Sequence, residues 1–158
     1  MSTTKNNVLV QMLDERVVRL GVDGLDTPQS VIEYSGNLLV EAGKVNGQYV
    51  KDMVEAYHLL GAYIVMAPGL AMPHARPEGN VKENAVSFVQ LRTPVAFHSE
   101  ANDPVKIVIA VAGVSNDGHI ELLQALSSLL SAENIIEKLA EVVSYEELIA
   151  MIEKEGCE

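Results

Sequence analysis

The feature that most constrains the fold is an apolar run at Val105–Ala112 (VKIVIAVA), which leads directly into a helical pattern. The β-branched residues of this run are typical of a buried strand. Ser115–Gly118 then supplies turn and N-cap residues, and His119 and the leucines at 122, 123, 126, 129 and 130 follow with helical spacing. A strand that passes into a helix in this way predicts an α/β fold.

Weaker patterns along the rest of the chain repeat this alternation. They predict strands at 17–22, 62–67, 70–72 and 85–91, and helices that begin at Pro28, near Gly47, at Glu133 and at Ser144. Thr27 is expected to cap the first of these helices and Gly43 to end it. The first dozen residues are expected to be loose or to begin a short helix. No repeat or long polar linker divides the 158 residues, so we expect one domain.

The sheet is expected to be mixed, with helices on both faces. The link between the strands near residues 70 and 86 is too short to contain a crossover helix, and this favours some antiparallel pairing. Hydrophobic residues make up 48% of the chain but aromatic ones only 4%, so the core must be aliphatic.

The charge of the chain excludes several classes of partner. Its formal net charge is −11, from 22 acidic and 11 basic side chains, which disfavours nucleic acid and anionic lipid and favours a basic protein face. No apolar run approaches the roughly 20 residues that span a bilayer, and the N-terminus lacks a signal-peptide pattern. The only cysteine is Cys157, which suits a reducing compartment. We therefore expect a cytoplasmic protein without membrane insertion.

The most reactive candidate is His74, in the segment APGLAMPHARP at Ala67–Pro77. Prolines on both sides restrict its backbone, and Arg76 supplies a permanent cation that pairs with phosphate oxygens or an acidic partner. Such a segment fixes the orientation of a nucleophilic imidazole at the lip of a sheet. The alternative is an ordinary loop histidine beside a solvated arginine.

A second candidate is His119, in the first turn of the helix that follows the strongest strand. Backbone N–H groups are unpaired at a helix start, so Asp117, Gly118 and His119 mark a favourable place for an anion. Open α/β sheets also bind ligands where a strand passes into a helix. The alternative is a histidine that only packs on Leu123.

None of the remaining sequence patterns is a stronger candidate for a functional site. His58 borders an apolar helix face, and His98 is expected to be an exposed residue without a role. No two histidines have the local spacing of a zinc site, so we predict no metal. The sequence also lacks a P-loop, a dinucleotide fingerprint and a nucleophile elbow, which disfavours a nucleotide-binding kinase or a hydrolase.

The octapeptide GLAMPHAR at Gly69–Arg76 resembles the signature around the phosphorylated histidine of the enzyme IIA components of the bacterial phosphoenolpyruvate:sugar phosphotransferase system (PTS), of the mannitol/fructose type. The preceding GAYIVMAPG at Gly61–Gly69 is most similar to the ascorbate branch of that superfamily. Segments 94–97, 103–111 and 118–123 also fall where the family has a strand, a strand and a helix led by histidine. The likeness extends from about Leu13 to Ile152.

The resemblance implies a phosphocarrier with a mixed five-stranded sheet. His74 would accept phosphate from the carrier protein HPr and donate it to a cysteine of enzyme IIB, and the membrane component IIC would couple it to uptake of ascorbate or a related sugar. His119 would hydrogen-bond the phosphoryl group. From the local chemistry alone, Arg76 and the helix start at Asp117 and Gly118 are expected to contact the phosphoryl oxygens. No cofactor or magnesium is implied.

Some points stay open. Mannitol-type relatives carry an Arg-Glu pair late in the helix before the signature, where this chain has Glu55–His58, so His58 replaces the helix cation or the cation is missing. We expect Cys157 to be an inert tail residue and IIB to be a separate polypeptide. A homodimer is kept as an alternative to the monomer. A regulatory module that senses phosphorylation, and a binding domain in which His74 is structural, remain the alternatives.

Overall fold

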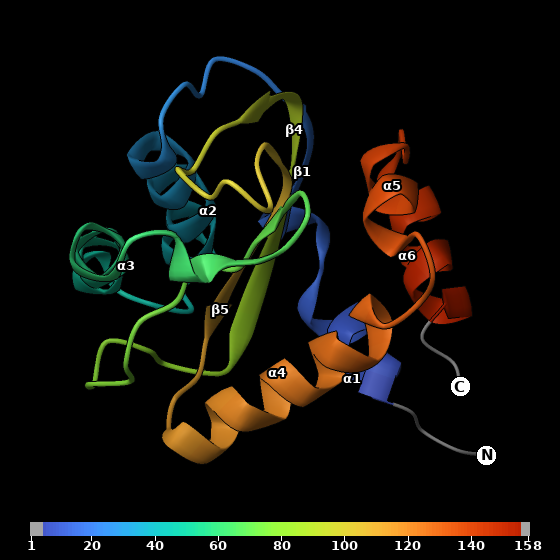
Figure 1. Cartoon of the computed structure of the whole chain (residues 1–158). Coiled ribbons are helices and arrows are strands. Elements are labelled where there is room, and N and C mark those ends of the chain that lie inside the picture. Colours follow the sequence, from blue (N-terminus) through green and yellow to red (C-terminus); the bar gives the residue numbers. More distant parts are fainter. Residues whose placement is uncertain (1–4, 156–158) are drawn as a thin grey trace.

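The computed structural model describes residues 5–155 and places a central sheet between helices (Figure 1). In chain order the elements are α1 (Lys5–Met12), a 3-10 turn (Glu15–Val17), β1 (Val18–Val22), α2 (Pro28–Glu41), α3 (Gly47–Leu60), a 3-10 turn (Ala62–Ile64), β2 (Val65–Ala67), β3 (Leu70–Ala71), β4 (Ala85–Val95), β5 (Val105–Ala112), α4 (Asn116–Leu130), α5 (Ile135–Ala140) and α6 (Tyr145–Glu155). Helices α2 and α3 lie on one side of the sheet, and α1, α4, α5 and α6 lie on the other. The predicted α/β class, with helices on both faces, is confirmed.

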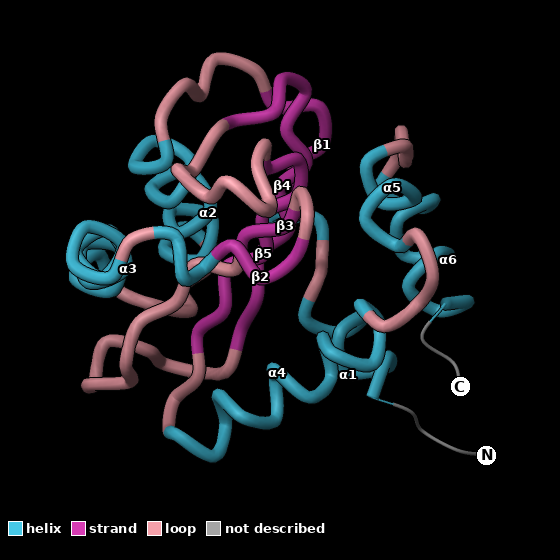
Figure 2. The backbone as a smooth tube through the Cα atoms, viewed as in Figure 1, coloured by secondary structure: helices cyan, strands magenta, loops and turns pink. Residues whose placement is uncertain are grey.

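The five strands form one mixed sheet in the order β1-β4-β5-β3-β2 (Figure 2). Strand β5 pairs antiparallel with β4 and parallel with β3, and the outer pairs are β1 with β4, parallel, and β2 with β3, antiparallel. The predicted mixed sheet of five strands is confirmed. The strands near residues 70 and 86 run in opposite directions, as a short link requires, but β5 lies between them.

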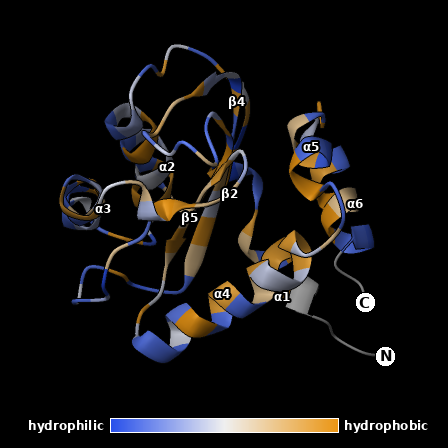
Figure 3. Ribbon diagram, viewed as in Figure 1, coloured by the Kyte–Doolittle hydropathy of each residue, from blue (hydrophilic) through white to orange (hydrophobic). Residues whose placement is uncertain are grey.

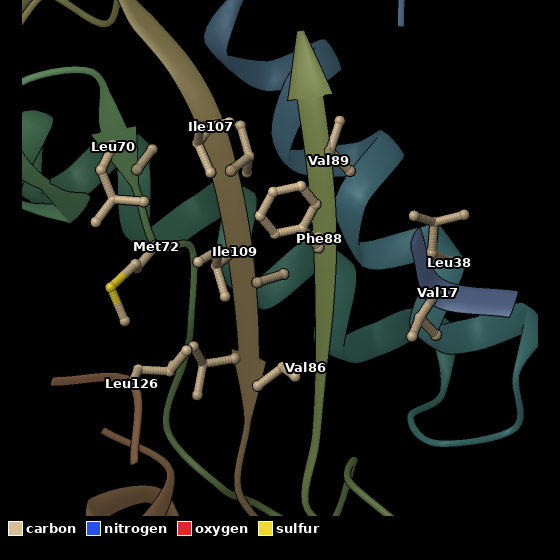
Figure 4. Close-up of a cluster of buried hydrophobic side chains, with 14 of the residues drawn as sticks. Val17, Leu38, Leu70, Met72, Val86, Phe88, Val89, Ile107, Ile109 and Leu126 are labelled. Carbon is tan, nitrogen blue, oxygen red and sulfur yellow. The ribbon is translucent and has the colours of Figure 1, made fainter. Parts of the chain in front are cut away.

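The core lies on both faces of β4 and β5 and is mainly aliphatic (Figures 3 and 4). Phe88 and Ile109 face each other across the antiparallel pair and are 1% and 2% exposed. Leu126 of α4 and Leu38 of α2 reach this core from the two helical layers. Burying an aliphatic or aromatic side chain of this size contributes about 1.5–3 kcal/mol, so the sheet centre carries much of the stability.

The predicted capping of α2 is confirmed. The Thr27 hydroxyl accepts the Ser30 N–H at 3.1 Å and Ser30 returns the bond, forming a capping box with Pro28 at the first helical position. Beyond the other end of α2, Gly43 adopts a positive φ of 77°. These two signals fix the length of the helix that covers β4.

Several boundaries differ from the sequence prediction. Ala62–Ile64 forms a 3-10 turn instead of the first half of a strand, because the chain leaves α3 through Gly61 at φ 73° and must reverse toward the sheet edge. Strand β4 continues past Leu91 to Val95, where Val95 pairs with Val105.

Three further boundaries differ. Helix α5 begins at Ile135 because Asn134 is left-handed, Val17 belongs to a 3-10 turn, and β3 ends at Ala71 instead of Met72. Of the first dozen residues, Lys5–Met12 is helical. Residues 1–4 and Cys157, with the predictions made for them, lie outside the described residues.

Candidate active site

Two neighbouring parallel strands carry both candidate histidines to the same edge of the sheet. Strands β3 and β5 pair Leu70 with Ile107 and Ala71 with Val108, so their carboxyl ends lie side by side. The segment that contains His74 leaves β3, and α4, which contains His119, follows β5. The Val111 N–H donates to the Pro73 carbonyl at 2.9 Å, which holds the residue before His74 against β5.

The His74 ring is held in one tautomer. Its Nδ1 lies 2.8 Å from the Met72 carbonyl oxygen, which can only accept a hydrogen bond. In the neutral ring Nδ1 therefore carries the proton, and Nε2 keeps a free lone pair. The Tyr63 ring packs edge-on against the imidazole, with centroids 5.5 Å apart and planes at 73°. A half-buried imidazole held in this way is prepared to act as a nucleophile through Nε2.

The His119 ring lies beside it, with the two centroids 5.1 Å apart and the planes inclined by 44°. Among the described side chains, those of residues 8–155, Nδ1 of His119 is the buried polar atom that lacks a hydrogen-bond partner. Buried N–H groups without a partner are rarer than buried acceptors without one, so we assign the proton of the neutral ring to Nε2. Burial, and then the neighbouring His74, lowers the pKa of His119 below 6.5. His119 is thus a neutral donor beside the nucleophile.

Glycine allows the close approach that brings His119 there. A Cβ on Gly113 would lie 2.6 Å from the backbone N and Cα of His119, a distance that real Cβ atoms do not show. Ser115 caps α4 by accepting the Gly118 N–H at 3.0 Å. The sharp passage from β5 into α4 therefore depends on a residue without a side chain at position 113.

Tyr49 of α3 fixes the segment that follows His74. Its side chain is fully buried, and its hydroxyl donates to the Val111 carbonyl at 2.7 Å and accepts the Ala75 N–H at 3.1 Å. Burial raises the pKa of Tyr49 to about 12, so this hydroxyl keeps its proton at any ordinary pH. One phenol therefore ties together α3, β5 and the His74 loop.

A hollow of about 610 Å³ opens beside the two imidazoles. The residues that line it are Asp52, Glu55, Ala56, Leu59, Leu60, Tyr63, His74, Ala75, Arg76, Pro77, Glu78, Asn116 and His119. Arg76 is the cation of this lining, against the carboxylates of Asp52, Glu55 and Glu78. The exposed Leu59 and Leu60 add an apolar edge. A reacting group would meet two imidazoles and one guanidinium within a mostly acidic and apolar rim.

The structure brings together some of the predicted site residues and not others. His74, His119 and Arg76 line the same hollow, whereas Asp117 and Gly118 do not. The Gly118 N–H is already bonded to the Ser115 hydroxyl, so it is not free for an anion.

His58 lies 3.1 Å from the Gln29 side chain, in a different hollow that also contains His98, and so does not supply a cation beside His74. Sequence reasoning missed Tyr49, Tyr63 and Asn116. Of these three residues, only Asn116 had a signal in the sequence, namely its position beside the predicted helix start.

Metal-ligand clusters and membrane-spanning helices are both absent from the described residues. Within residues 5–155, no three His, Cys, Asp or Glu side chains lie together in a way that could hold a metal ion. In the same part of the chain, every helix is too short or too polar to cross a bilayer.

The fold and the paired histidines define a class of phosphotransferase domain, and comparison with known families identifies it. The family model of the phosphoenolpyruvate-dependent sugar phosphotransferase system, EIIA 2, matches residues 11–155. The chain belongs to this family and is therefore a phosphotransferase component of a sugar PTS. The family resemblance inferred from GLAMPHAR is confirmed.

Individual relatives support the assignment. The chain is similar to the ascorbate-specific PTS system EIIA component of Shigella boydii serotype 4, with 33% identity over 90% of this chain and 93% of that protein. It also resembles the mannitol-specific cryptic phosphotransferase enzyme IIA CmtB from Escherichia coli (30% identity, 91% and 97% covered, TM-score 0.79). A third match is enzyme IIA of mannitol in complex with phosphorylated enzyme IIB, also from E. coli (28% identity, 88% and 95% covered, TM-score 0.77).

Proposed function

We propose that Nε2 of His74 accepts a phosphoryl group from the phosphohistidine of HPr and passes it to a cysteine of a separate enzyme IIB. The observation that carries this proposal is the bond from Nδ1 to the Met72 carbonyl, because it leaves Nε2 unprotonated on a ring that lines the hollow. The known complex of a related IIA with phosphorylated IIB supports the choice of acceptor.

The transfer needs alignment and charge stabilisation from this chain. The lone pair of Nε2 forms a bond to phosphorus while the bond from phosphorus to the donor imidazole breaks, and its electron pair stays on the donor ring. In the second step a cysteine thiolate attacks phosphorus, and the electrons of the N–P bond return to His74. The Met72 carbonyl stabilises the positive charge that the His74 ring carries between the two steps.

His119 and Arg76 have the chemistry to stabilise the phosphoryl oxygens. The proton on Nε2 of His119 is directed away from its buried Nδ1, and Arg76 lines the same hollow. Donors already in place where charge develops need no reorganisation during the reaction. Asn116, at the start of α4, is a further polar side chain in the lining.

The sugar is proposed from the relatives. Curated relatives at 33% identity are named as ascorbate-specific, so we assign this chain to uptake of ascorbate or a related acid sugar through enzymes IIB and IIC. Phosphoenolpyruvate is a metabolite of the cytoplasm, and the transfer is accordingly placed there. No metal ion enters the proposed steps.

The test is phosphorylation of the full chain, followed by intact mass. With phosphoenolpyruvate, enzyme I and HPr, the wild-type protein should gain one phosphoryl group, and His74→Ala should gain none. His119→Ala should still be phosphorylated, but about 10²-fold more slowly, because one donor to the developing charge is lost. His98→Ala, which changes a histidine in the other hollow, is the matched control and should behave as wild type.

Two outcomes would contradict the proposal. Absence of a mass gain in the wild type, with an HPr that phosphorylates another IIA, would reject the phosphocarrier role. Phosphorylation of His74 without onward transfer to any of a panel of IIB proteins would favour the regulatory alternative.

A further inference from the structure

Asn84 connects the start of β4 to the end of β5. It directly precedes Ala85, which pairs with Ala112, so its half-buried side chain lies beside the point where the chain leaves β5 for α4. Its Oδ1 accepts the Val114 N–H at 2.9 Å. The amide thereby holds the short connection that ends at the N-cap of α4.

The same amide also contacts the first turn of α4. A Cβ built on Gly118 would lie 2.6 Å from Oδ1 and 3.0 Å from Nδ2 of Asn84. The side chain of Asn84 is therefore packed directly against the Cα of Gly118, in space that any other residue at 118 would fill. Asn84 thus touches the chain on both sides of the Ser115 cap.

His119 is the next residue after that contact. Gly113 abuts its backbone, and Asn84 bonds Val114 and packs on Gly118. The His119 side chain has no hydrogen bond of its own to fix it at Nδ1. Its placement 5.1 Å from the His74 ring must therefore come from the backbone of this turn.

We infer that Asn84 is a positioning residue for phosphoryl transfer: by clamping the first turn of α4, it sets the His119 ring against His74. The inference rests on the transfer reaction proposed above. Asn84 does not line the hollow and touches no reacting group. Asn84 acts by aligning His119 with His74. A small displacement of the His119 ring, the proposed hydrogen-bond donor, is enough to slow phosphoryl transfer.

The first test replaces the amide. Asn84→Ala should lower the first-order transfer rate constant about tenfold while the KM for phosphorylated HPr changes less than about twofold. Asn84→Asp keeps an oxygen that accepts the Val114 N–H and should recover most of the rate. Asn37→Ala, on the exposed side of α2, is the matched control and should equal wild type.

The second test adds a methyl group at Gly118, the residue against which the Asn84 amide packs. Gly118→Ala should displace the Asn84 amide and slow transfer as Asn84→Ala does. In the Asn84→Ala background, where the space is empty, Gly118→Ala should add no further loss. Non-additivity of this kind identifies a direct interaction, whereas two independent structural defects would multiply.

A spectroscopic measurement separates this inference from the transfer reaction. In the unphosphorylated protein, the imidazole ¹⁵N and ¹³C resonances of His119 should move in Asn84→Ala and return in Asn84→Asp, while those of His98 stay constant. Unmoved His119 resonances together with an unchanged rate would overturn the role of Asn84. If the His119 resonances move in Asn84→Ala but the wild-type protein takes up no phosphate, the proposed function alone is rejected and the positioning role of Asn84 stands.

Discussion

The chemistry of single residues here depends on which nitrogen of each imidazole holds its proton. A backbone carbonyl decides this for His74, through the 2.8 Å contact to Nδ1, and burial decides it for His119. The two rings therefore play different roles, although both are histidine side chains at the same sheet edge. One presents a lone pair and the other an N–H.

Burial of His119 predicts a dependence of stability on pH. Its pKa is lowered on folding, so below about pH 6.5 the unfolded chain binds a proton that the folded chain refuses. The stability that the neutral ring contributes is present above that pH and is lost as the pH falls. Urea unfolding midpoints should therefore fall more in wild type than in His119→Gln when the pH drops from about 7.5 to about 5.

The control for this prediction is His98→Gln, which removes an exposed imidazole and should track the wild type. Equal acid sensitivity in wild type and His119→Gln would show that His119 is solvated as in the unfolded chain. An NMR titration of the His119 ring provides the direct check, with a midpoint below 6.5.

The sequence pointed to three residues that the structure brings into one hollow, but not to the residues that hold them there. His74, His119 and Arg76 lie within two short segments. The prolines, cap residues and strand boundary of these segments can be recognised in the sequence. Tyr49 was not identified, because it stands on an ordinary amphipathic helix and its importance comes from reaching Val111, 62 residues away. A contact over such a separation leaves no local pattern.

At the scale of elements, α3 is tied to the sheet by the Tyr49 hydroxyl. Tyr49→Phe removes the partner of two backbone groups, the Val111 carbonyl and the Ala75 N–H. We expect the free energy of unfolding to fall by about 1–3 kcal/mol, measured by urea denaturation. We also expect slower phosphorylation of His74, because the segment after it loses its anchor.

Tyr57→Phe is the matched comparison on the same helix. Tyr57 donates one hydrogen bond, to the Phe97 carbonyl at 3.0 Å, and lines the hollow that lacks His74. It should lose about 1 kcal/mol of stability and keep the wild-type transfer rate. Slower transfer in Tyr57→Phe than in Tyr49→Phe would contradict the special role of the Tyr49 bond.

The elements themselves were largely predictable where one periodicity dominated. Strand β5 lies at its predicted bounds because the apolar run has no helical alternative of that length, and α2 begins at its capping box. The prediction of a strand at Ala62–Ile64 was wrong. An apolar run does not show that Gly61, at a positive φ, has already turned the chain away from the sheet.

For the molecule as a whole, charge should govern how fast partners arrive. The net charge is −11, and Asp52, Glu55 and Glu78 stand around the hollow. A partner with a basic face is steered toward such a rim, and this attraction is screened by salt. The second-order rate constant for phosphorylation should therefore fall about tenfold between roughly 50 mM and roughly 500 mM NaCl.

Charge variants test whether the rim is responsible. Glu55→Gln with Glu78→Gln should lower the association rate and weaken its salt dependence, while Glu153→Gln on the exposed side of α6 should change neither. A rate that rises with salt would mean that the partner presents an acidic face.

The strand order was beyond the reach of the sequence. Strands β3 and β4 follow each other along the chain, but in the sheet they are separated by β5, which comes after both of them in the sequence. This arrangement depends on long-range packing of apolar faces that resemble one another. It is also what makes β3 and β5 neighbours and thereby joins the two histidines.

The antiparallel β4–β5 pair places its connecting loop, residues 96–104, at the end of the sheet opposite the hollow. The eight residues of β5 put roughly 26 Å of rigid strand between the two ends. Glu100 and Ala101 are exposed in that loop. A fluorophore could be attached there in a chain whose single native thiol, at Cys157, has been replaced. It would report complex formation in real time while the dye stays away from the hollow that contains His74.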